Sequence, residues 1–371
     1  MIKVLHFFKT YYPQTMGGIE QVIYQLAEGG PAQGFESEVL YLSAQGAARN
    51  EQVGHHRVHR AKLDLEIAST GLSLSAFKDF AELARQADIV HFHFPWPYMD
   101  LVHFATRLGK PTVVTYHSDI VKQKWLRMLY QPLMHRFLSS VDCIVTSSPN
   151  YVVSSPVLPR YKDKVKVIPF GLDKATHPVP TPERLAHWRE RLGERFFLFV
   201  GALRYYKGLD YLLEAAALTK LPVVILGSGH LEAELKRQAA VKGVENVHFL
   251  GGLADDDKVA LLQLCYAFVF PSHLRSEAFG ISLLEAAMYG KPLISCEMGT
   301  GTTFINIADE TGRVVPPRDA PALAKAMREL WDDPEMAQSM GARAALRYQQ
   351  VFTAEAMISA YAQVYRSLLE K

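Results

Sequence analysis

Cysteine is scarce in this sequence: Cys143, Cys265 and Cys296 are the three among 371 residues, and they lie far apart. An odd number of cysteines without metal-type spacing predicts a reducing, cytosolic compartment and argues against a disulfide-stabilised secreted scaffold. Long apolar runs are also missing. No stretch of 18 apolar residues occurs, so we expect no membrane-spanning helix. The opening residues MIKVLHFF hold one lysine and too short an apolar run for a signal peptide.

Two glycine motifs that mark common enzyme classes are absent as well. The sequence has no G-x-G-x-x-G, so a dinucleotide fingerprint is missing, and no G-x-S-x-G, which argues against Ser-His-Asp chemistry. The net charge of +2 is spread unevenly, because residues 1–171 hold 18 basic and 14 acidic residues and the remainder has a net charge of −2. This mild asymmetry is compatible with a first half that faces an anionic lipid surface. We expect no nucleic-acid partner.

Apolar strands alternate with helical segments from one end of the chain to the other. The predicted strands of the first half are IKVLHFF, EVLYLS, ADIVHFHF, PTVVTYH, CIVTSS and KVIPFGLD, and those of the second half are FFLFVG, PVVILGSG, VHFLGG, AFVFPS and PLISCE. Continuous apolar strands between helices are typical of parallel sheets covered on both faces. Two such series predict two doubly wound α/β domains, joined near the proline-rich stretch DKATHPVPTPERL, with the ligand in the cleft between them.

Three loops at the ends of predicted strands carry candidate binding residues. Gly17 and Gly18 open a helix after the first strand, where backbone N–H groups can approach a phosphate, although a glycine pair at such a turn more often reflects turn geometry alone. Arg204 and Lys207 follow FFLFVG and suit a diphosphate, or they form a solvated basic loop.

The third loop is the stretch SEAFGISLLEAAMYGKP, residues 276–292. We expect a helix here whose free N–H groups, at Phe279, Gly280 and Ile281, hold a phosphate oxygen. Glu277 before the helix and Glu285 within it can accept hydrogen bonds from paired hydroxyls, as the two sugars of a nucleotide-sugar would require. The alternative is that Glu277 stabilises the helix electrostatically and Glu285 is simply exposed.

These stretches resemble family 4 glycosyltransferases, which are retaining enzymes of the GT-B fold. EAFGISLLE looks like the E-x7-E element of that family, and MGGIE, TYHSD, PFGLD, RYYKG and FLGGL follow in the family's order. The resemblance covers essentially the whole chain. Within the family, HFFKTYYPQTMGGIEQVIYQL and SHLRSEAFGISLLE look most like bacterial mannosyl- and rhamnosyltransferases of lipopolysaccharide O-antigen synthesis, which use GDP-sugars.

The resemblance implies a domain plan and residue roles. Residues 1–172 would form an acceptor-binding Rossmann-like domain, with the helix at about 355–371 packing back on it, and residues 173–354 the nucleotide-sugar domain. Gly17 and Gly18 would approach the donor phosphates. Arg204 and Lys207 would clamp the diphosphate, with backbone contacts from Phe279, Gly280 and Ile281. Glu277 would hold the donor sugar, Glu285 the ribose, and His117 would lie beside the reacting sugar carbon.

We expect the loop LADDDK to determine which nucleobase the protein binds. In the resembling family it runs beside the base, so Leu253 would contact the ring and Asp255 would accept hydrogen bonds from guanine, with Lys258 facing a guanine carbonyl or steadying the carboxylate. The same loop contains an Asp-x-Asp pattern that binds a divalent cation in other glycosyltransferases. We favour helix capping by at least one of these aspartates and expect no metal or other cofactor.

Histidines occur in two groups that need a separate explanation. His91 and His93 alternate along one predicted strand, and His55, His56 and His59 lie in a polar stretch. Neither group has a carboxylate or cysteine at fixed spacing, so we interpret them as structural or surface residues rather than metal ligands.

The reaction expected from these features is transfer of mannose or D-rhamnose from a GDP-sugar to a lipid-linked saccharide acceptor. The basic amphipathic segment at residues 120–138 would lie on an anionic membrane at the cytoplasmic face, or it is an ordinary helix covering the sheet. Alternatives are a UDP-sugar donor in other cell-surface polysaccharide synthesis, another GT-B enzyme, or a binding protein that lost catalysis. The donor sugar, the linkage, the acceptor, processivity, the oligomeric state and any nucleophile are left open.

Overall fold

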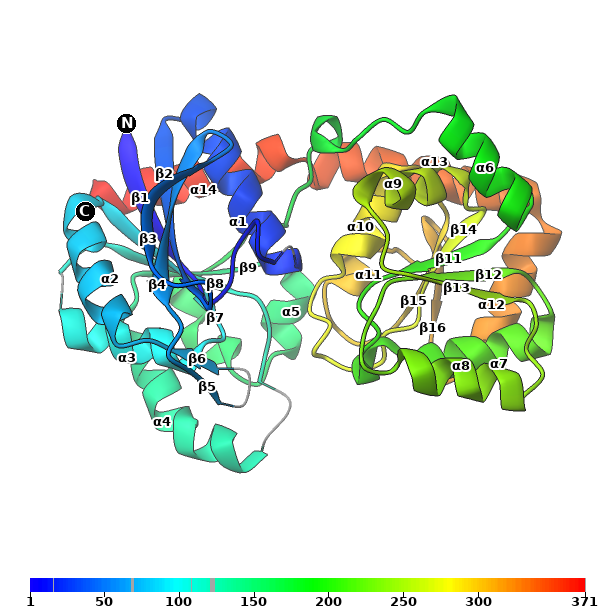
Figure 1. The fold of residues 1–371 in the computed structure, drawn as a ribbon, viewed down its shortest axis with the longest axis horizontal. Helices are drawn as coiled ribbons and strands as arrows, with labels where there is room; N and C mark the ends of the chain where they lie inside the picture. Colours follow the sequence, from blue (N-terminus) through cyan, green and yellow to red (C-terminus); the bar gives the residue numbers. More distant parts are fainter. Residues whose placement is uncertain (16, 68–69, 108, 121–123, 371) are drawn as a thin grey trace. The chain divides into compact units, whose positions relative to one another are not determined.

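A computed structural model of the chain describes residues 1–15, 17–67, 70–107, 109–120 and 124–370. The chain forms two compact units (Figure 1). The first unit comprises Met1–Gly171 and Thr353–Lys371, and the second comprises Leu172–Phe352. Each unit holds a parallel sheet between helices, which confirms the predicted α/β class with two Rossmann-like halves.

The first unit is built on an eight-stranded sheet in the order β10-β9-β8-β7-β1-β2-β4-β3. All neighbours are parallel except β3, which runs antiparallel to β4. The strands are β1 (Ile2–Phe7), β2 (Phe35–Ser43), β3 (Ala48–Val53), β4 (His56–Lys62), β7 (Ile89–Phe94), β8 (Thr112–Tyr116), β9 (Cys143–Thr146) and β10 (Val165–Val167). A separate antiparallel pair is formed by β5 (Leu65–Ile67) and β6 (Thr70–Leu72).

Helices α1 (Gly18–Gly29), α2 (Ser75–Gln86), α3 (Pro97–Thr106), α4 (Lys124–Ser140), α5 (Pro149–Ser154) and α14 (Ala354–Leu369) belong to this unit. The final helix, α14, packs against α1, although more than 300 residues separate them in the chain. Gly29 allows the close approach, because a Cβ atom there would lie 2.3 Å from the side chain of Ile358. Tyr365 of α14 reaches the sheet, where its hydroxyl hydrogen-bonds His91.

The second unit contains a six-stranded, all-parallel sheet in the order β13-β12-β11-β14-β15-β16. Its strands are β11 (Phe197–Val200), β12 (Val223–Leu226), β13 (Val247–Gly251), β14 (Ala267–Phe270), β15 (Leu293–Cys296) and β16 (Gly312–Val315). Every residue of β11, β12, β14 and β15 is buried, as the unbroken apolar runs predict for strands covered on both faces.

The helices of the second unit are α6 (Pro182–Leu192), α7 (Leu209–Thr219), α8 (Glu232–Val241), α9 (Asp255–Leu264), α10 (Ile281–Met288), α11 (Thr302–Ile305), α12 (Ala320–Asp332) and α13 (Pro334–Val351). Figure 1 shows them on both faces of the sheet, with α7 packed on α12 and α10 packed on α13. No helix among the described residues has the length and apolar character that crossing a membrane requires.

Candidate functional site

The second unit gathers charged side chains at the carboxyl ends of β11 and β14. The Lys207 Nζ atom lies 2.5 Å from Oε2 of Glu277, and the Ser272 hydroxyl donates to the same oxygen at 3.3 Å. The lysine and glutamate side chains are 10% and 12% exposed. The predicted phosphate-binding cation and the predicted sugar-binding carboxylate therefore form one ion pair, fixed by a serine that sequence reasoning missed.

Arg204 has a different environment. It precedes the short 3-10 turn Tyr205–Lys207, is exposed, and forms no ion pair with any residue that the structure describes. A guanidinium without a protein carboxylate beside it keeps its full charge for a ligand. The loop after β11 thus presents one cation that is paired with a glutamate, Lys207, and one without a carboxylate partner among the described residues, Arg204.

Two glycines shape these loops, and Gly208 lets the backbones of two of them pack closely. Gly208 has φ +69, and a Cβ atom there would lie 2.1 Å from the carbonyl oxygen of Pro271. Gly280 has φ +98 and precedes the first residue of α10, Ile281. Both conformations are in the left-handed region that favours glycine.

The entrance of α10 has no side-chain cap, so the free N–H groups of its first turn are not satisfied in that way. Residues 277–280 are not helical. Glu285 therefore lies one turn into the helix, closer to its entrance than a helix begun at Glu277 would place it. The predicted phosphate contacts at Phe279, Gly280 and Ile281 lie at this entrance, with Phe279 buried.

Glu285 is 4% exposed, so the alternative that it is simply a surface residue is wrong. Lys258 Nζ lies 3.0 Å from Oε1 of Glu285 and 3.0 Å from Oδ1 of Asp255. Burial lowers the pKa of Lys258, but the two carboxylates outweigh it and hold the pKa above its usual value. Three residues that were assigned separately to ribose and base therefore form one cluster.

The expectation that an aspartate of LADDDK caps the helix is wrong. The N-cap of α9 is Ala254, and the three aspartates occupy the first turn, where negative charge suits the helix dipole. Asp257 accepts hydrogen bonds from Arg184 at 2.5 Å and from Trp188 at 2.9 Å. The Asp255 side chain is 73% exposed and Leu253 is 37% exposed, so both lie at the surface of the second unit.

Sequence reasoning also missed His177 and Tyr289. The Tyr289 hydroxyl lies 3.2 Å from Nδ1 of His177, and Lys174 lies 5.0 Å from the centre of the tyrosine ring. Burial lowers the pKa of His177, and the nearby carboxylate of Glu285 acts in the opposite direction. Tyr289 follows Glu285 by four residues, a helical spacing that could have identified it.

In the first unit, Gly17 is the N-cap of α1 and Gly18 its first residue. The carboxylate of Glu20 lies over this end, and a Cβ atom on Gly17 would lie 2.7 Å from its Oε2. Thr10 and Thr15 donate to Oε1 of Glu20 at 2.7 and 3.1 Å. Glycine at position 17 therefore has a packing reason, and a phosphate here would meet this carboxylate.

His117 follows β8 and is 6% exposed. Its Nε2 lies 3.0 Å from Nδ1 of His93, whose Nε2 lies 3.1 Å from Nδ1 of His6. Burial lowers the pKa of His117 to about 3, so its ring is neutral at physiological pH. The sequence pattern singled out His93 and His117 separately but missed His6, which comes from a strand distant in sequence.

The remaining histidines of the polar stretch are structural, as interpreted. His56 is buried and bonds Glu28 and Tyr11, and His59 is buried and bonds Glu38. Their stretch forms part of β3 and β4, which the sequence analysis did not predict. Among the described residues, one group of three side chains brings possible metal-ligand atoms within 4.8 Å of one another: His6, His91 and His93.

Comparisons with known proteins show the family to which the chain belongs. Residues 16–176 match the family described as Glycosyltransferase Family 4, and residues 182–347 match Glycosyl transferases group 1. The chain is 61% identical to the D-rhamnosyltransferase WbpZ of Pseudomonas aeruginosa, over 95% of this chain and 93% of that protein. It is 54% identical to the O-antigen chain mannosyltransferase C of Escherichia coli, over 100% and 99% of the two chains.

A solved structure extends the comparison to the fold. The sucrose-phosphate synthase of Thermosynechococcus elongatus superimposes with a TM-score of 0.81 over the full length of both chains, at 22% identity. A likeness at this identity establishes the fold alone, and it confirms the two-domain GT-B architecture that the motifs indicated.

Proposed function

Because the chain belongs to the glycosyltransferases of family 4, we propose that it transfers mannose or D-rhamnose from a GDP-sugar to a lipid-linked saccharide acceptor in O-antigen synthesis. One close relative is named as a D-rhamnosyltransferase and the other as an O-antigen chain mannosyltransferase. These names support mannose or D-rhamnose as the sugar and O-antigen synthesis as the pathway. The nucleotide, the acceptor and the place of action at the cytoplasmic face of a membrane are part of the proposal.

One observation carries the proposal: Arg204, the Lys207–Glu277 pair and the uncapped entrance of α10 all lie beyond the carboxyl ends of β11 and β14. Ligands of open parallel sheets bind at such ends. A diphosphate fits the two cations and the helix N-terminus, and the carboxylate of Glu277 fits hydroxyl groups of the attached sugar. Glu285 and Lys258 supply a second polar cluster for the nucleoside.

The chemistry follows from where charge develops. As the bond from the anomeric carbon to the phosphate oxygen breaks, its electron pair moves onto the leaving diphosphate. Arg204, Lys207 and the N–H groups of α10 stabilise that charge, so the reaction needs no metal ion in this proposal. Retention follows if the acceptor hydroxyl attacks from the face the phosphate leaves and gives its proton to the departing phosphate oxygen. From the family resemblance, we also propose that His117 contacts the sugar.

The test is a panel of GDP- and UDP-sugars, scored by release of free nucleoside diphosphate and by thermal stabilisation of the protein. We expect GDP-mannose or GDP-D-rhamnose to stabilise the protein and to release GDP when an acceptor is present, with and without a chelator. Stabilisation by UDP-sugars alone would replace the donor assignment. Binding without turnover in the presence of saccharide acceptors would favour a nucleotide-sugar-binding protein.

A further inference from the structure

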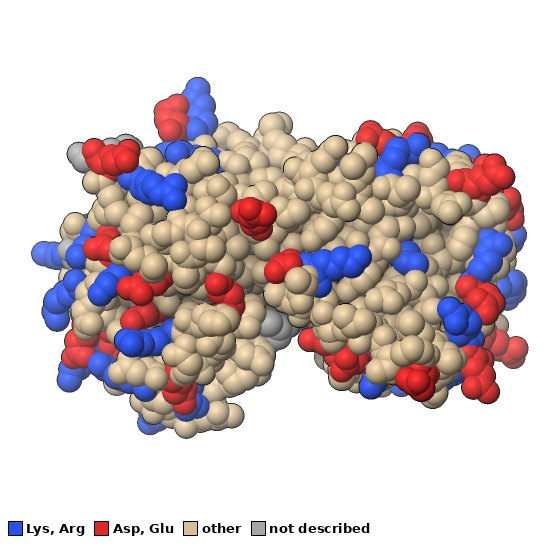
Figure 2. All heavy atoms as spheres, turned by 90° about the horizontal axis from the view of Figure 1, so that it is seen from above, with Lys and Arg blue, Asp and Glu red and all other residues tan. Residues whose placement is uncertain are grey.

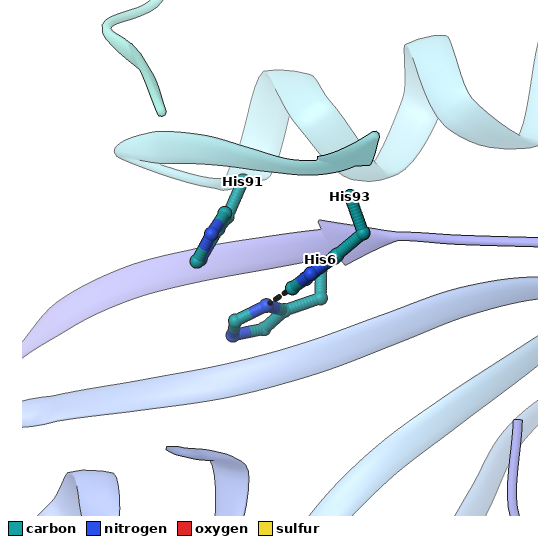
Figure 3. Close-up of side chains that lie close together, drawn as sticks. All are labelled: His6, His91 and His93. Carbon is teal, nitrogen blue, oxygen red and sulfur yellow. Dashed lines mark hydrogen bonds between the residues drawn. The ribbon is translucent and has the colours of Figure 1, made fainter. Parts of the chain in front are cut away.

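A chain of hydrogen-bonded side chains crosses the sheet of the first unit and ends at His117. It begins at Ser37 on β2, whose Oγ lies 3.2 Å from Nε2 of His6 on β1. It continues from Nδ1 of His6 to Nε2 of His93 on β7 at 3.1 Å, and from Nδ1 of His93 to Nε2 of His117 at 3.0 Å. Figure 3 shows His6 and His93 reaching toward one another from different strands.

All three rings are neutral. His6 and His93 are 0% exposed and His117 is 6% exposed. Burial lowers the pKa of His6 and of His117 to about 3, and lowers that of His93 well below its ordinary value. A neutral imidazole has one N–H and one lone pair. Each ring that donates a hydrogen bond through one nitrogen must therefore accept one through the other. All the hydrogen bonds from Ser37 to His117 then run in the same donor-to-acceptor direction.

Ser37 sets that direction. Among the described residues, His6 is the hydrogen-bond partner of the Ser37 hydroxyl, which is nearly buried. If the hydroxyl accepted from His6, its own proton would have no protein partner among the described residues and would depend on water in the adjoining cavity, which Ser37 lines. Nearly buried donors without a protein partner are rarer and costlier than unfilled lone pairs. The hydroxyl therefore donates to Nε2 of His6. The ring then donates from Nδ1 to His93, which donates from Nδ1 to Nε2 of His117.

We propose that His6 and His93 are positioning residues that hold His117 as the tautomer protonated on Nδ1. No residue that the structure describes hydrogen-bonds this nitrogen. His117 thus offers a bound molecule an N–H donor, which suits an oxygen of a sugar hydroxyl or of a phosphate. This extends the proposed function, on which the identity of the bound molecule depends.

A metal ion is a weaker explanation of the same cluster. Both nitrogens of His6, His91 and His93 already have hydrogen-bond partners. The rings of His91 and His93 are stacked, with centroids 4.5 Å apart and planes at 24°, and the His6 and His93 planes also meet at 24°. Lone pairs lie in the ring planes, so stacked rings do not direct them at one ion.

The protein offers a matched control residue for His93. His91 lies in the same cluster and is 0% exposed, but it bonds the Tyr365 hydroxyl and Thr115 Oγ1, each at 2.7 Å, and has no bond to His117. His93→Phe and His91→Phe each keep a ring of similar size and each remove two side-chain hydrogen bonds. The two variants therefore perturb packing alike, while only His93→Phe interrupts the series of hydrogen bonds that ends at His117.

The first experiment reads protons directly. Long-range proton–nitrogen spectra of the protein labelled with isotopic histidine show which ring nitrogen is protonated, and His117→Gln assigns the His117 signals. We expect the proton of His117 on Nδ1 in the wild type and in His91→Phe, and loss of this single tautomer in His93→Phe. A wild-type His117 protonated on Nε2, or metal retained in stoichiometric amount after purification, would overturn the proposal.

The second experiment measures function on the same variants. Hydrogen-bond partners that orient metal-bound histidines contribute roughly 10–100-fold, and we expect an effect of the same order for the groups that orient His117. We expect His93→Phe to lower kcat/KM at least about tenfold more than His91→Phe does, with similar thermal stability for both. Equal losses in both variants would mean that His93 acts through packing alone. If the donor assignment itself is wrong, the wild type is inactive with GDP-sugars, while the spectra still decide the tautomer.

Discussion

Lys207 and Glu277 neutralise one another in the second unit, while Arg204 beside them forms no ion pair with a described residue. The two cations should therefore respond differently to removal. Arg204→Ala should lower kcat/KM roughly a hundredfold, or about 3 kcal/mol, because a charge-assisted contact to the leaving phosphate is lost. Its melting temperature should not change. Steady-state kinetics and thermal unfolding check both, with Arg237→Ala on exposed α8 as a control for loss of a surface charge.

Lys207→Ala should lose activity and stability together. Glu277 is 12% exposed and would keep Ser272 as a partner but lose the opposing charge at 2.5 Å. Removing one member of a largely buried ion pair leaves the other uncompensated, at a cost of about 2–3 kcal/mol. Near-full activity in both Arg204→Ala and Lys207→Ala would contradict the position assigned to the diphosphate.

Substitutions at Asp255 and Lys258 should affect different properties, nucleotide recognition at Asp255 and folding stability at Lys258. Asp255→Ala should weaken GDP binding much more than UDP binding, because a carboxylate that pairs with guanine N–H groups rejects bases lacking them. The structure adds that stability should hardly change, since Asp255 is exposed and is not the N-cap of α9. Titration calorimetry with both nucleotides measures the ratio. Equal weakening for GDP and UDP would remove Asp255 from the site.

Lys258→Met is the companion variant. It leaves the carboxylate of Glu285, whose side chain is 5% exposed, without its cation, so we expect a loss of several kcal/mol in unfolding free energy. A variant that is as stable as the wild type would show that the 3.0 Å contact contributes little.

At the scale of elements, glycines decide how closely the loop after β11 can approach the end of β14. Gly208 and Gly243 have similar backbone angles, φ +69 and φ +61, but a Cβ atom at Gly208 meets the Pro271 carbonyl at 2.1 Å and one at Gly243 meets open space. Gly243→Ala should cost roughly 1–2 kcal/mol for its left-handed conformation. Gly208→Ala should cost clearly more and weaken nucleotide binding. Denaturant unfolding compares them, and equal losses would contradict the close approach.

Element prediction from the sequence succeeded where one physical signal dominated. The runs FFLFVG and AFVFPS became fully buried strands, because only covered parallel strands are apolar on both sides. It failed at β3 and β4, where Arg57 and Arg60 alternate with buried Val58 and Ala61 in a stretch that looked polar. The α9 cap was also assigned wrongly, because aspartates suit both the cap and the first turn of a helix.

The candidate site was less predictable than the fold, since its contacts join distant residues. Each charged residue was identified from its own loop, but the pairing of Lys207 with Glu277 spans 70 positions. The contact of His6 with His93 spans 87 positions, and it depends on β1 lying next to β7, an order that no local pattern encodes. The individual residues of the site can therefore be predicted from the sequence, while the contacts between them can be predicted only when the strand order is known.

At the scale of the whole molecule, the first unit should be sensitive to acid. His6, His91, His93 and His117 are buried, and burial lowers the pKa of each below its unfolded value near 6.5. Well above pH 6.5 these histidines are unprotonated in both states, so their titration does not make stability depend on pH. As pH falls below 6.5, the unfolded state binds protons that the folded state refuses, so stability falls by up to roughly 1.4 kcal/mol per pH unit for each histidine.

Thermal unfolding between pH 7 and pH 5 measures this slope. His91→Phe removes one of the four titrating groups, so its stability should fall less steeply with acid, although the variant is less stable at pH 7. A slope equal to that of the wild type would show that His91 takes up no proton on unfolding in this range.

The remaining prediction concerns the segment at residues 120–138, where a lipid-linked acceptor would bring the protein to a membrane. Of its apolar residues, Phe137 and Leu138 are buried in the first unit, which fits the alternative of a helix covering the sheet. Met128 and Leu129 of α4 are 60% and 80% exposed, and Arg136 lies over the ring of Phe104. Lys122 lies outside the described residues. The exposed apolar residues that the structure describes in this segment are therefore Met128 and Leu129, and the burial of the Lys124 and Arg127 side chains lies outside the description.

The whole chain has little net charge, and Figure 2 shows acidic and basic residues interspersed over one face, so a local basic segment must supply any attraction to anionic lipid. We expect co-sedimentation with phosphatidylserine vesicles at low salt that is lost at high salt, because each basic residue near the surface contributes about 1 kcal/mol that salt screens. Replacing Lys122, Lys124 and Arg127 with glutamine should abolish binding. Removing the same number of charges from α8 and its C-cap residue, at Lys236, Arg237 and Lys242, should leave binding intact, since those side chains pair with glutamates on the second unit. Absence of vesicle binding at low salt, or an equal loss of binding in both triple variants, would show that α4 covers the sheet and does not bind a membrane.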